Sequence, residues 1–270
     1  MAATTFPADL AASRRSLART LAVYAKEAKY ELINRTRIPV YAISTVVLPL
    51  MFYVLFGIVL SSGKDRPENA TYMLATMGCF GVIAVALFGF GVSLAMERGQ
   101  GWLQVKRASP MPVSAYFLAK LFSAVVFSMV IMLLLLAVGI TFGGVHLPLG
   151  TAVKIVGILV AGSIPFSAMG LAIGYFAKPN SAPAVVNLIY LPMSFCSGLW
   201  IPLFMLPHGL QVLAKFLPPF HLAQLALNAI GMGMDPTPAW GHVEALLAFT
   251  LICLGVAVWG YRRDEGKTYG

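Results

Sequence analysis

Few residue patterns in this chain could perform chemistry. Gly266-Lys267-Thr268 has the order of residues that ends a phosphate-binding loop. Such a loop also needs a glycine five positions before Gly266, where this chain has Tyr261, and a preceding β-strand, where it has a long apolar run. The sequence contains no nucleophile elbow, no HExxH pattern and no carboxylate pair in a catalytic setting. We therefore predict that the chain is not an enzyme and binds no ATP by itself.

The thiols and carboxylates disfavour a metal site and an ion-driven mechanism. Cys79, Cys196 and Cys253 lie inside apolar runs without metal-ligand spacing, so we expect small core residues and neither a disulfide nor a metal. All ten acidic residues lie in predicted loops or at the ends of apolar runs, as Glu97 and Glu244 do. Carriers driven by protons or sodium usually bury Asp, Glu or His within the membrane. If the protein moves a solute against a gradient, we expect the energy to come from a separate protein.

Neutral hydrogen-bonding groups and aromatic rings are the features that the apolar runs do carry. They suit a pathway for an amphipathic or apolar cargo, and packing between helices is the alternative explanation for each of them. The candidate pathway residues are Ser44, Thr45, Asn187, Tyr190, Ser194, Phe195, Ser197 and Trp200. A second set, His221, Gln224 and Asn228, shares one face of a short predicted helix and either lines an outer vestibule or simply faces water.

The composition places these residues in an all-α membrane protein. Of the 270 residues, 59% are hydrophobic and 11% are charged, whereas about a quarter are charged in a soluble domain. The net charge of +9 does not indicate nucleic acid as a partner, because Lys and Arg lie between apolar runs and not on one soluble face. Runs long enough to cross roughly 30 Å of hydrocarbon predict six spans. These runs cover 38–60, 71–96, 113–142, 151–176, 183–204 and 243–261.

The distribution of Lys and Arg predicts that both termini lie in the cytoplasm. Positive charge in short loops is retained on the cytoplasmic side during insertion. With the N-terminus inside, fourteen of these residues lie in cytoplasmic segments and four, Lys64, Arg66, Lys154 and Lys215, lie outside. Lys120 remains in the inner part of the third span. The first span follows a charged segment, so we expect no cleaved signal peptide.

Three regions follow from this topology. Residues 1–37 form a cytoplasmic N-terminus, in which 13–35 has an apolar stripe opposite basic residues and is expected to be an amphipathic helix in the inner interface. That helix is either an anchor or an elbow that also touches a cytoplasmic partner. Residues 38–261 form the transmembrane domain, and 262–270 a cytoplasmic tail. Within the domain, prolines and a glycine divide 206–232 into two short re-entrant helices at the outer face.

Two local patterns resemble those of a known family, the membrane subunits of ABC-2 type transporters. The first comprises Glu97-Arg98-Gly99-Gln100-Gly101-Trp102-Leu103 followed by Arg107-Ala108-Ser109-Pro110-Met111-Pro112-Val113. The second comprises Ser197-Gly198-Leu199-Trp200-Ile201-Pro202, then Leu206-Pro207 and Leu217-Pro218-Pro219-Phe220-His221. The length, the six spans and the basic amphipathic helix also fit this family, and the subgroup resembles multidrug or lipid exporters.

The resemblance implies an exporter permease in a bacterial inner membrane. It implies two copies of the chain with two ATP-binding subunits that carry ATP and Mg, and a drug, lipid or glycan as cargo. The loop after the second span would dock in a groove of the ATP-binding subunit, with aromatic and Arg anchors typical of binding hot spots. Its candidate coupling residues are Glu97, Arg98, Gly99, Trp102, Leu103, Lys106, Arg107 and Pro110. A secondary carrier or channel and a non-transporting scaffold are the alternative functions.

Overall fold

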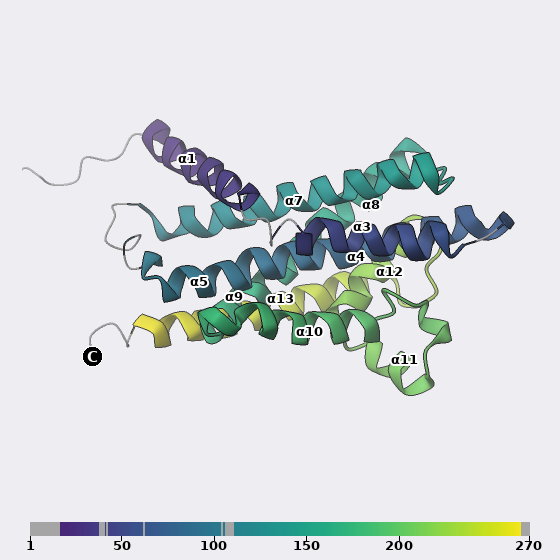
Figure 1. The fold of residues 1–270 in the computed structure, drawn as a ribbon. Coiled ribbons are helices and arrows are strands. Elements are labelled where there is room, and N and C mark those ends of the chain that lie inside the picture. Colours follow the sequence, from purple (N-terminus) through teal and green to yellow (C-terminus); the bar gives the residue numbers. More distant parts are fainter. Residues whose placement is uncertain are drawn as a thin grey trace, which may run out of the picture.

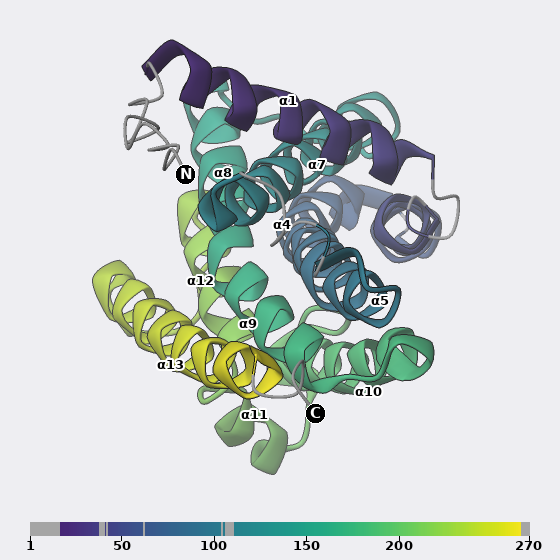
Figure 2. The same cartoon turned by 90° about the vertical axis from the view of Figure 1, so that its left-hand side faces the viewer.

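The helices run side by side as a bundle, and α1 (Leu17–Thr36) lies across one end of it (Figures 1 and 2). The structure is a computed structural model that describes residues 17–37, 41, 43–61, 63–103, 105 and 111–265. Within these ranges all regular structure is helical and no strand occurs, which confirms the all-α prediction. We call the end with α1 and the last turns of α13 (Ala239–Glu265) the near end, and the opposite end the far end.

Several helices of the bundle are built from consecutive segments. The first consists of the π-helical η1 (Ile43–Val47), α3 (Leu48–Phe52) and the π-helical η2 (Tyr53–Val59). After the short turn η3 (Gly63–Asp65), the second consists of α4 (Arg66–Ala86), the π-helical η4 (Leu87–Val92) and α5 (Ser93–Gly99). The others are α7 (Val113–Phe142), α8 (Leu149–Ala161), α9 (Ser163–Phe176), η5 (Pro179–Ser181), α10 (Ala182–Cys196), η6 (Leu203–Met205), α11 (His208–Ala214) and α12 (Pro218–Ala229).

Proline and glycine set the helix ends. Pro112 and Pro148 lie in extended backbone directly before α7 and α8, because proline fixes φ and cannot donate to the preceding turn. Gly198 ends α10 with φ of 77°, and the N–H of Leu199 donates to the Ser194 carbonyl at 3.2 Å. This is the Schellman arrangement, in which only glycine adopts the left-handed backbone without steric cost. The two short helices predicted within 206–232 are present as α11 and α12.

The helix α4 is the centre of the core. Every residue from Met73 to Ala86 is buried, whereas α7 and α13 expose much of their apolar surface. Small residues allow the close packing: a Cβ added to Gly170 of α9 would lie 3.0 Å from the Ala86 carbonyl oxygen. Gly170 and Gly174 of α9 therefore serve packing within the chain.

Four helices in the described ranges are long and apolar enough to cross a membrane. They are Arg66–Gly99, Val113–Phe142, Leu149–Phe176 and Ala239–Asp264, and they correspond to the predicted spans at 71–96, 113–142, 151–176 and 243–261. The other two predicted spans coincide with shorter helices, the segmented helix 43–59 and the 15-residue α10. Both shorter helices run alongside the long ones (Figure 1).

Candidate functional site

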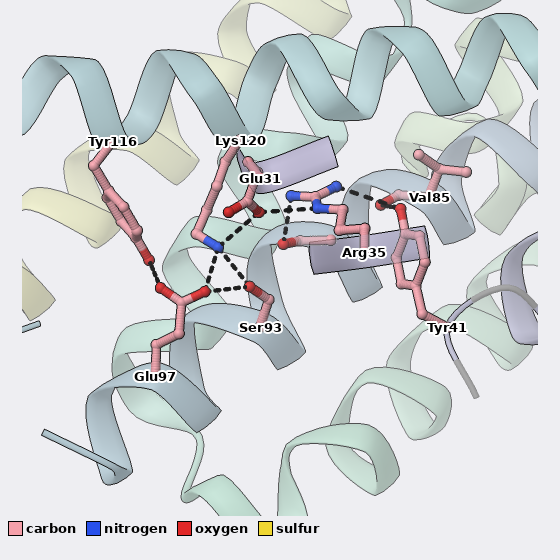
Figure 3. A network of polar contacts seen from close by, with 9 residues as sticks. Glu31, Arg35, Tyr41, Val85, Ser93, Glu97, Tyr116 and Lys120 are labelled. Atoms are coloured by element: carbon pink, nitrogen blue, oxygen red, sulfur yellow. Dashed lines mark hydrogen bonds and ion pairs between the residues drawn. The ribbon is translucent and has the colours of Figure 1, made fainter. Parts of the chain in front are cut away.

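A buried polar network joins α1 to two helices of the bundle at the near end (Figure 3). We call it the near-end network. Its side chains come from α1, from the residue that precedes the first bundle helix, from α5 and from α7. They are Glu31, Arg35, Tyr41, Ser93, Glu97, Tyr116 and Lys120. The buried part of α1 carries Glu31 and Arg35 together with the half-buried Tyr24, Ala28 and Leu32 of the predicted apolar stripe, while Leu21 of that stripe is 62% exposed.

Lys120 is the centre of this network. Its ammonium group is fully buried and donates to Glu31 Oε1 at 3.0 Å, Glu97 Oε1 at 2.6 Å and Ser93 Oγ at 2.5 Å. The other Glu97 oxygen accepts the Tyr116 hydroxyl at 2.7 Å. All three ammonium hydrogens therefore have acceptors, which is the condition under which a charge can be buried without a large desolvation cost.

Arg35 connects the network to the π-helical segment η4. Its Nε donates to Glu31 Oε1 at 3.0 Å, and its Nη2 donates to the Gly89 carbonyl at 3.0 Å. The N–H of Ser93 bonds to the Phe88 carbonyl five residues back and not to the Gly89 carbonyl four residues back. Arg35 thus binds a carbonyl whose usual α-helical donor is engaged elsewhere. A Cβ added at Gly89 would lie 2.4 Å from Arg35 Nη1, so the contact requires glycine.

The charges of the network balance, with two carboxylates and two cations. Burial raises the pKa of the Glu31 carboxyl, but the charges and hydrogen bonds of Lys120 and Arg35 lower it by more, and its pKa lies below the ordinary value. Glu31 is therefore ionised at neutral pH and holds α1 onto the bundle as one member of a neutral cluster.

The start of the predicted coupling loop is anchored to the α9–α10 connection. Arg98 donates to the carbonyls of Tyr175 and Ala177 and pairs with Asp264 at 3.7 Å. Gly99 packs directly on Pro179, since an added Cβ would lie 2.0 Å from the Pro179 Cγ. The end of α5 is thus fixed to its neighbours by side-chain and backbone contacts.

The two proposed anchors of that loop lie in different surroundings. Trp102 is 54% exposed at the near end, whereas Leu103 is 8% exposed and packs with Tyr116, Tyr175 and Ala257 of the protein's own core. Of these two residues, Trp102 offers free surface to a partner. Lys106, Arg107 and Pro110 lie outside the described residues, as do Gly266, Lys267 and Thr268.

Several candidate pathway residues meet in an aromatic cluster between the first bundle helix, α4 and α10. The ring of Tyr190 stacks on Phe80 at 4.6 Å, and its hydroxyl donates to the Phe80 carbonyl at 2.7 Å. Trp200 lies 5.1 Å from Phe52 and 5.6 Å from Phe80, between ring centroids. Phe195 lies 6.3 Å from Trp200. We call these five rings the aromatic cluster.

The neutral polar candidate residues differ in their burial and in their hydrogen-bond partners. Ser194 and Ser197 are buried, and their hydroxyls, like the Trp200 Nε1, have no hydrogen-bond partner among the described residues. The Thr45 hydroxyl donates to the carbonyl of Tyr41, four residues earlier, at 2.7 Å. Asn187 is exposed on α10. Ser44 lies in η1, but its side chain is outside the described part of the chain.

The outer set does not form one surface. His221 Nδ1 lies 3.0 Å from His242 Nδ1 of α13, and the buried Gln224 accepts the N–H of Met234 at 3.4 Å. Asn228 is exposed. These contacts hold α12 to its neighbours. Among the described residues, no group of three or more His, Cys, Asp or Glu side chains is arranged to hold a metal ion.

Sequence reasoning missed most of the near-end network. Lys120 had a visible signal, since a lysine within an apolar run needs a partner. Glu31 and Arg35 stand four residues apart in a predicted helix, which also indicates a pair. Their burial against α5 and α7 depends on the angle at which α1 crosses the bundle, which sequence periodicity does not determine.

The comparisons with known proteins agree with this architecture. A family model described as "ABC-2 type transporter" matches residues 27–230. The chain is also similar to the Bacillus subtilis (strain 168) protein "Putative transport permease YvfS", with 24% identity over 245 residues, which cover 90% of this chain and 98% of that protein. Members of this family are generally paired with a separate ATP-binding subunit. With this match and its long apolar helices, the chain is a multi-pass membrane protein that belongs to the ABC-2 type transporter family as a transport permease.

Proposed function

We propose that this chain is the transmembrane subunit of an ATP-driven exporter in a bacterial inner membrane. Two copies work with two ATP-binding subunits, which bind the ATP and Mg that this chain lacks the motif to hold. Closed two-fold assembly is the commonest arrangement of identical chains. The near end is cytoplasmic, in keeping with the fourteen-to-four distribution of Lys and Arg. The transported molecule is amphipathic or apolar, of a drug, lipid or glycolipid class.

The observation that carries this proposal is the continuity between Trp102 and the aromatic cluster. Trp102 follows directly on the helix 66–99, which carries Phe80 of the cluster. Seventeen residues separate Phe80 from Glu97, a distance of about 25 Å along a helix. Because Arg98, Gly99 and the near-end network fix the end of this helix, a force applied at Trp102 acts on the whole helix and on α1. That is the arrangement required to pass motion from a cytoplasmic ATPase to a pathway.

Six spans remain our proposal for the topology. The helix 43–59 and the 15 residues of α10 would reach about 25 Å and 22 Å at the α-helical rise. Both are shorter than the roughly 30 Å of hydrocarbon, but α10 continues into the buried residues Ser197, Gly198 and Leu199. In this proposal α1 lies in the inner interface, and α11 and α12 are re-entrant helices at the outer face.

The aromatic cluster supports the proposed cargo class. It places large rings beside unpaired hydroxyl groups and the Trp200 Nε1, at the boundary between α10 and the first bundle helix. A cargo with apolar surface and a few polar groups would be matched by such a lining. The exposed Asn187 lies on α10 as well, where a second copy of the chain could complete the pathway.

A secondary carrier is the second candidate, because the structure buries Lys120, Glu31 and Glu97 together. Ion-driven carriers use buried ionisable groups to bind the coupling ion. Here, however, the charges are already paired and lie at the near end of the bundle, whereas carriers place such sites near the bilayer midplane. We therefore assign this cluster a structural part in the exporter.

Reconstitution tests the proposal against this alternative. The chain is inserted into proteoliposomes with and without its ATP-binding subunit, and the movement of a fluorescent phospholipid and of a fluorescent amphiphile is followed. We expect movement that requires both ATP and the partner and that continues when a protonophore collapses the proton gradient. Movement driven by an imposed proton or sodium gradient without ATP would support the carrier instead.

A further inference from the structure

A pocket opens at the far end beside the first turns of α4. Its volume is about 460 Å³, and it lies between the first turns of α4 and the segments that contain Phe204 and Met232. Pockets for small organic molecules have volumes of roughly 300–1,000 Å³. We call this the far-end pocket.

The lining of the pocket combines negative charge with soft apolar surface. Asp65 and Glu68 contribute exposed carboxylates, and Tyr72 and Phe204 contribute aromatic rings. Met232 and Met234 add thioethers, which adapt to irregular ligands. The described lining residues include no Lys or Arg.

The neighbouring Arg66 lies outside the lining of the pocket. Its Nε donates to the Ser61 carbonyl at 3.3 Å. Aromatic rings beside carboxylates are the groups that attract organic cations, through the ring quadrupole and the opposite charge. The chemistry of the pocket thus selects for positive charge on an apolar body.

The helix dipole alone does not account for this arrangement. Acidic residues stabilise the first turn of a helix, and Asp65 and Glu68 stand at the start of α4. The helix dipole favours acidic residues in any exposed first turn, with or without a cavity and aromatic side chains nearby. Here the acidic residues line a cavity together with aromatic side chains.

The position of the pocket links it to the aromatic cluster. Asn69, Tyr72, Thr76 and Phe80 follow one another at three- and four-residue spacing, on one side of α4. Asn69 and Tyr72 line the pocket, and Phe80 belongs to the aromatic cluster. Tyr72, Met232 and Trp200 all pack against the same core. The pocket therefore lies at the far end of the helix face that leads to the cluster.

We propose that the far-end pocket binds amphipathic organic cations, and that such molecules belong to the cargo that leaves through it. The second half of this statement rests on the proposed function. The first half concerns binding to this chain and does not need the ATP-binding subunit.

Two ions of equal shape and opposite charge test the binding. The purified full-length chain in nanodiscs of neutral phospholipid is titrated with radiolabelled tetraphenylphosphonium, and tetraphenylborate is used in parallel. We expect saturable binding of the cation only. The Asp65→Asn, Glu68→Gln variant should bind it about three- to ten-fold more weakly, since each exposed charge contributes little in water. Glu244→Gln, which removes an exposed carboxylate outside the pocket, should bind it like the original protein.

Several results would overturn the binding proposal. Equal binding of the two ions, or equal affinity of both variants for the cation, would mean that the ions dissolve in the lipid or bind elsewhere. The isosteric substitutions on exposed side chains should leave folding intact, which gel filtration checks. Phe204→Ala provides a second probe, and unchanged cation affinity in that variant also counts against the pocket.

Adding the ATP-binding subunit to the same protein distinguishes failure of this inference from failure of the proposed function. If the ATP-binding subunit is added and the bound cation is never transported, export of cations is refuted while the binding site stands. If ATP-driven transport of a neutral phospholipid occurs but tetraphenylphosphonium does not bind, the exporter stands and the far-end pocket is not a cation site.

Discussion

Replacing Lys120 by Met should destabilise the protein more than any other single loss of charge among the described residues. The substitution keeps an unbranched side chain, shorter by one heavy atom, but removes a fully buried ammonium group with three acceptors. Glu31 and Glu97 then face each other without the cation between them. Removing one partner of a buried ion pair typically costs about 3–5 kcal/mol. For a chain of this size that corresponds to a fall in Tm on the order of 10 °C.

The assay is thermal unfolding of the purified protein in detergent, followed by circular dichroism at matched lipid content. Lys154→Met is the control, because Lys154 is an exposed lysine on α8. The triple variant Glu31→Gln, Glu97→Gln, Lys120→Met tests the cause, since it removes the unpaired carboxylates and should recover part of the loss. If Lys120→Met and Lys154→Met unfold at the same temperature, the network does not stabilise the fold and the reasoning is wrong.

Four further outcomes follow from the near end. Trp102→Ala should weaken binding of the ATP-binding subunit by about 2 kcal/mol, or roughly thirty-fold, as measured by co-purification. Trp240→Ala at the far end should not change this binding. Equal retention of the partner by both variants would place Trp102 in the lipid interface. Leu103→Ala should instead lower stability by about 2–4 kcal/mol in thermal unfolding, because Leu103 is buried in the chain's own core. Gly89→Ala should lower the free energy of unfolding by about 1–3 kcal/mol by displacing Arg35. Gly157→Ala, with nothing within 4 Å of the added Cβ, should leave stability unchanged or raise it. Equal effects of the two substitutions would contradict the close contact between Gly89 and Arg35. Because the pKa of Glu31 is lowered in the folded protein, its contribution to stability is present above the ordinary carboxyl pKa and is lost as the pH falls through the folded value. The protection of the α1 amides against hydrogen exchange, corrected for the intrinsic exchange rate at each pH, should therefore fall in acid, and Glu31→Gln should reduce that acid dependence.

The sequence predicted the elements whose signals are local. Apolar runs and the breaks within 206–232 each act within a few residues, and helices occur in each of these regions. The exposed Trp102 at the end of the helix 66–99 agrees with its predicted part as an anchor, which remains untested. Tyr190, Phe195 and Trp200, three of the eight candidate pathway residues, belong to one aromatic cluster, and their part in a pathway stays a prediction.

What could not be predicted depends on how the elements meet. The apolar stripe within 13–35 predicted an amphipathic helix, and Tyr24, Ala28 and Leu32 of that stripe are half-buried in α1. The stripe did not predict that Glu31 and Arg35 would be buried as well, because their burial depends on the partners Lys120 and Gly89 from other helices. Leu103 is a large apolar residue next to Trp102 in the same loop, so the local sequence does not distinguish the two. Its burial follows from the positions of Tyr175 and Ala257, which are far away in sequence. Contacts of this kind leave no periodic pattern.

Compared with a regular α-helix, the π-helical segment η4 adds about one residue to one turn of the helix 66–99. If that segment were to adopt α-helical hydrogen bonding, everything beyond it would turn by about 100°, the angle between successive residues of a helix. Glu97 would then rotate away from Lys120, while α4, with all its residues from Met73 to Ala86 buried, would stay in place. Arg35, which binds the Gly89 carbonyl, and Lys120, which binds Glu97, therefore hold α5 in the rotation that the π-helical segment gives it.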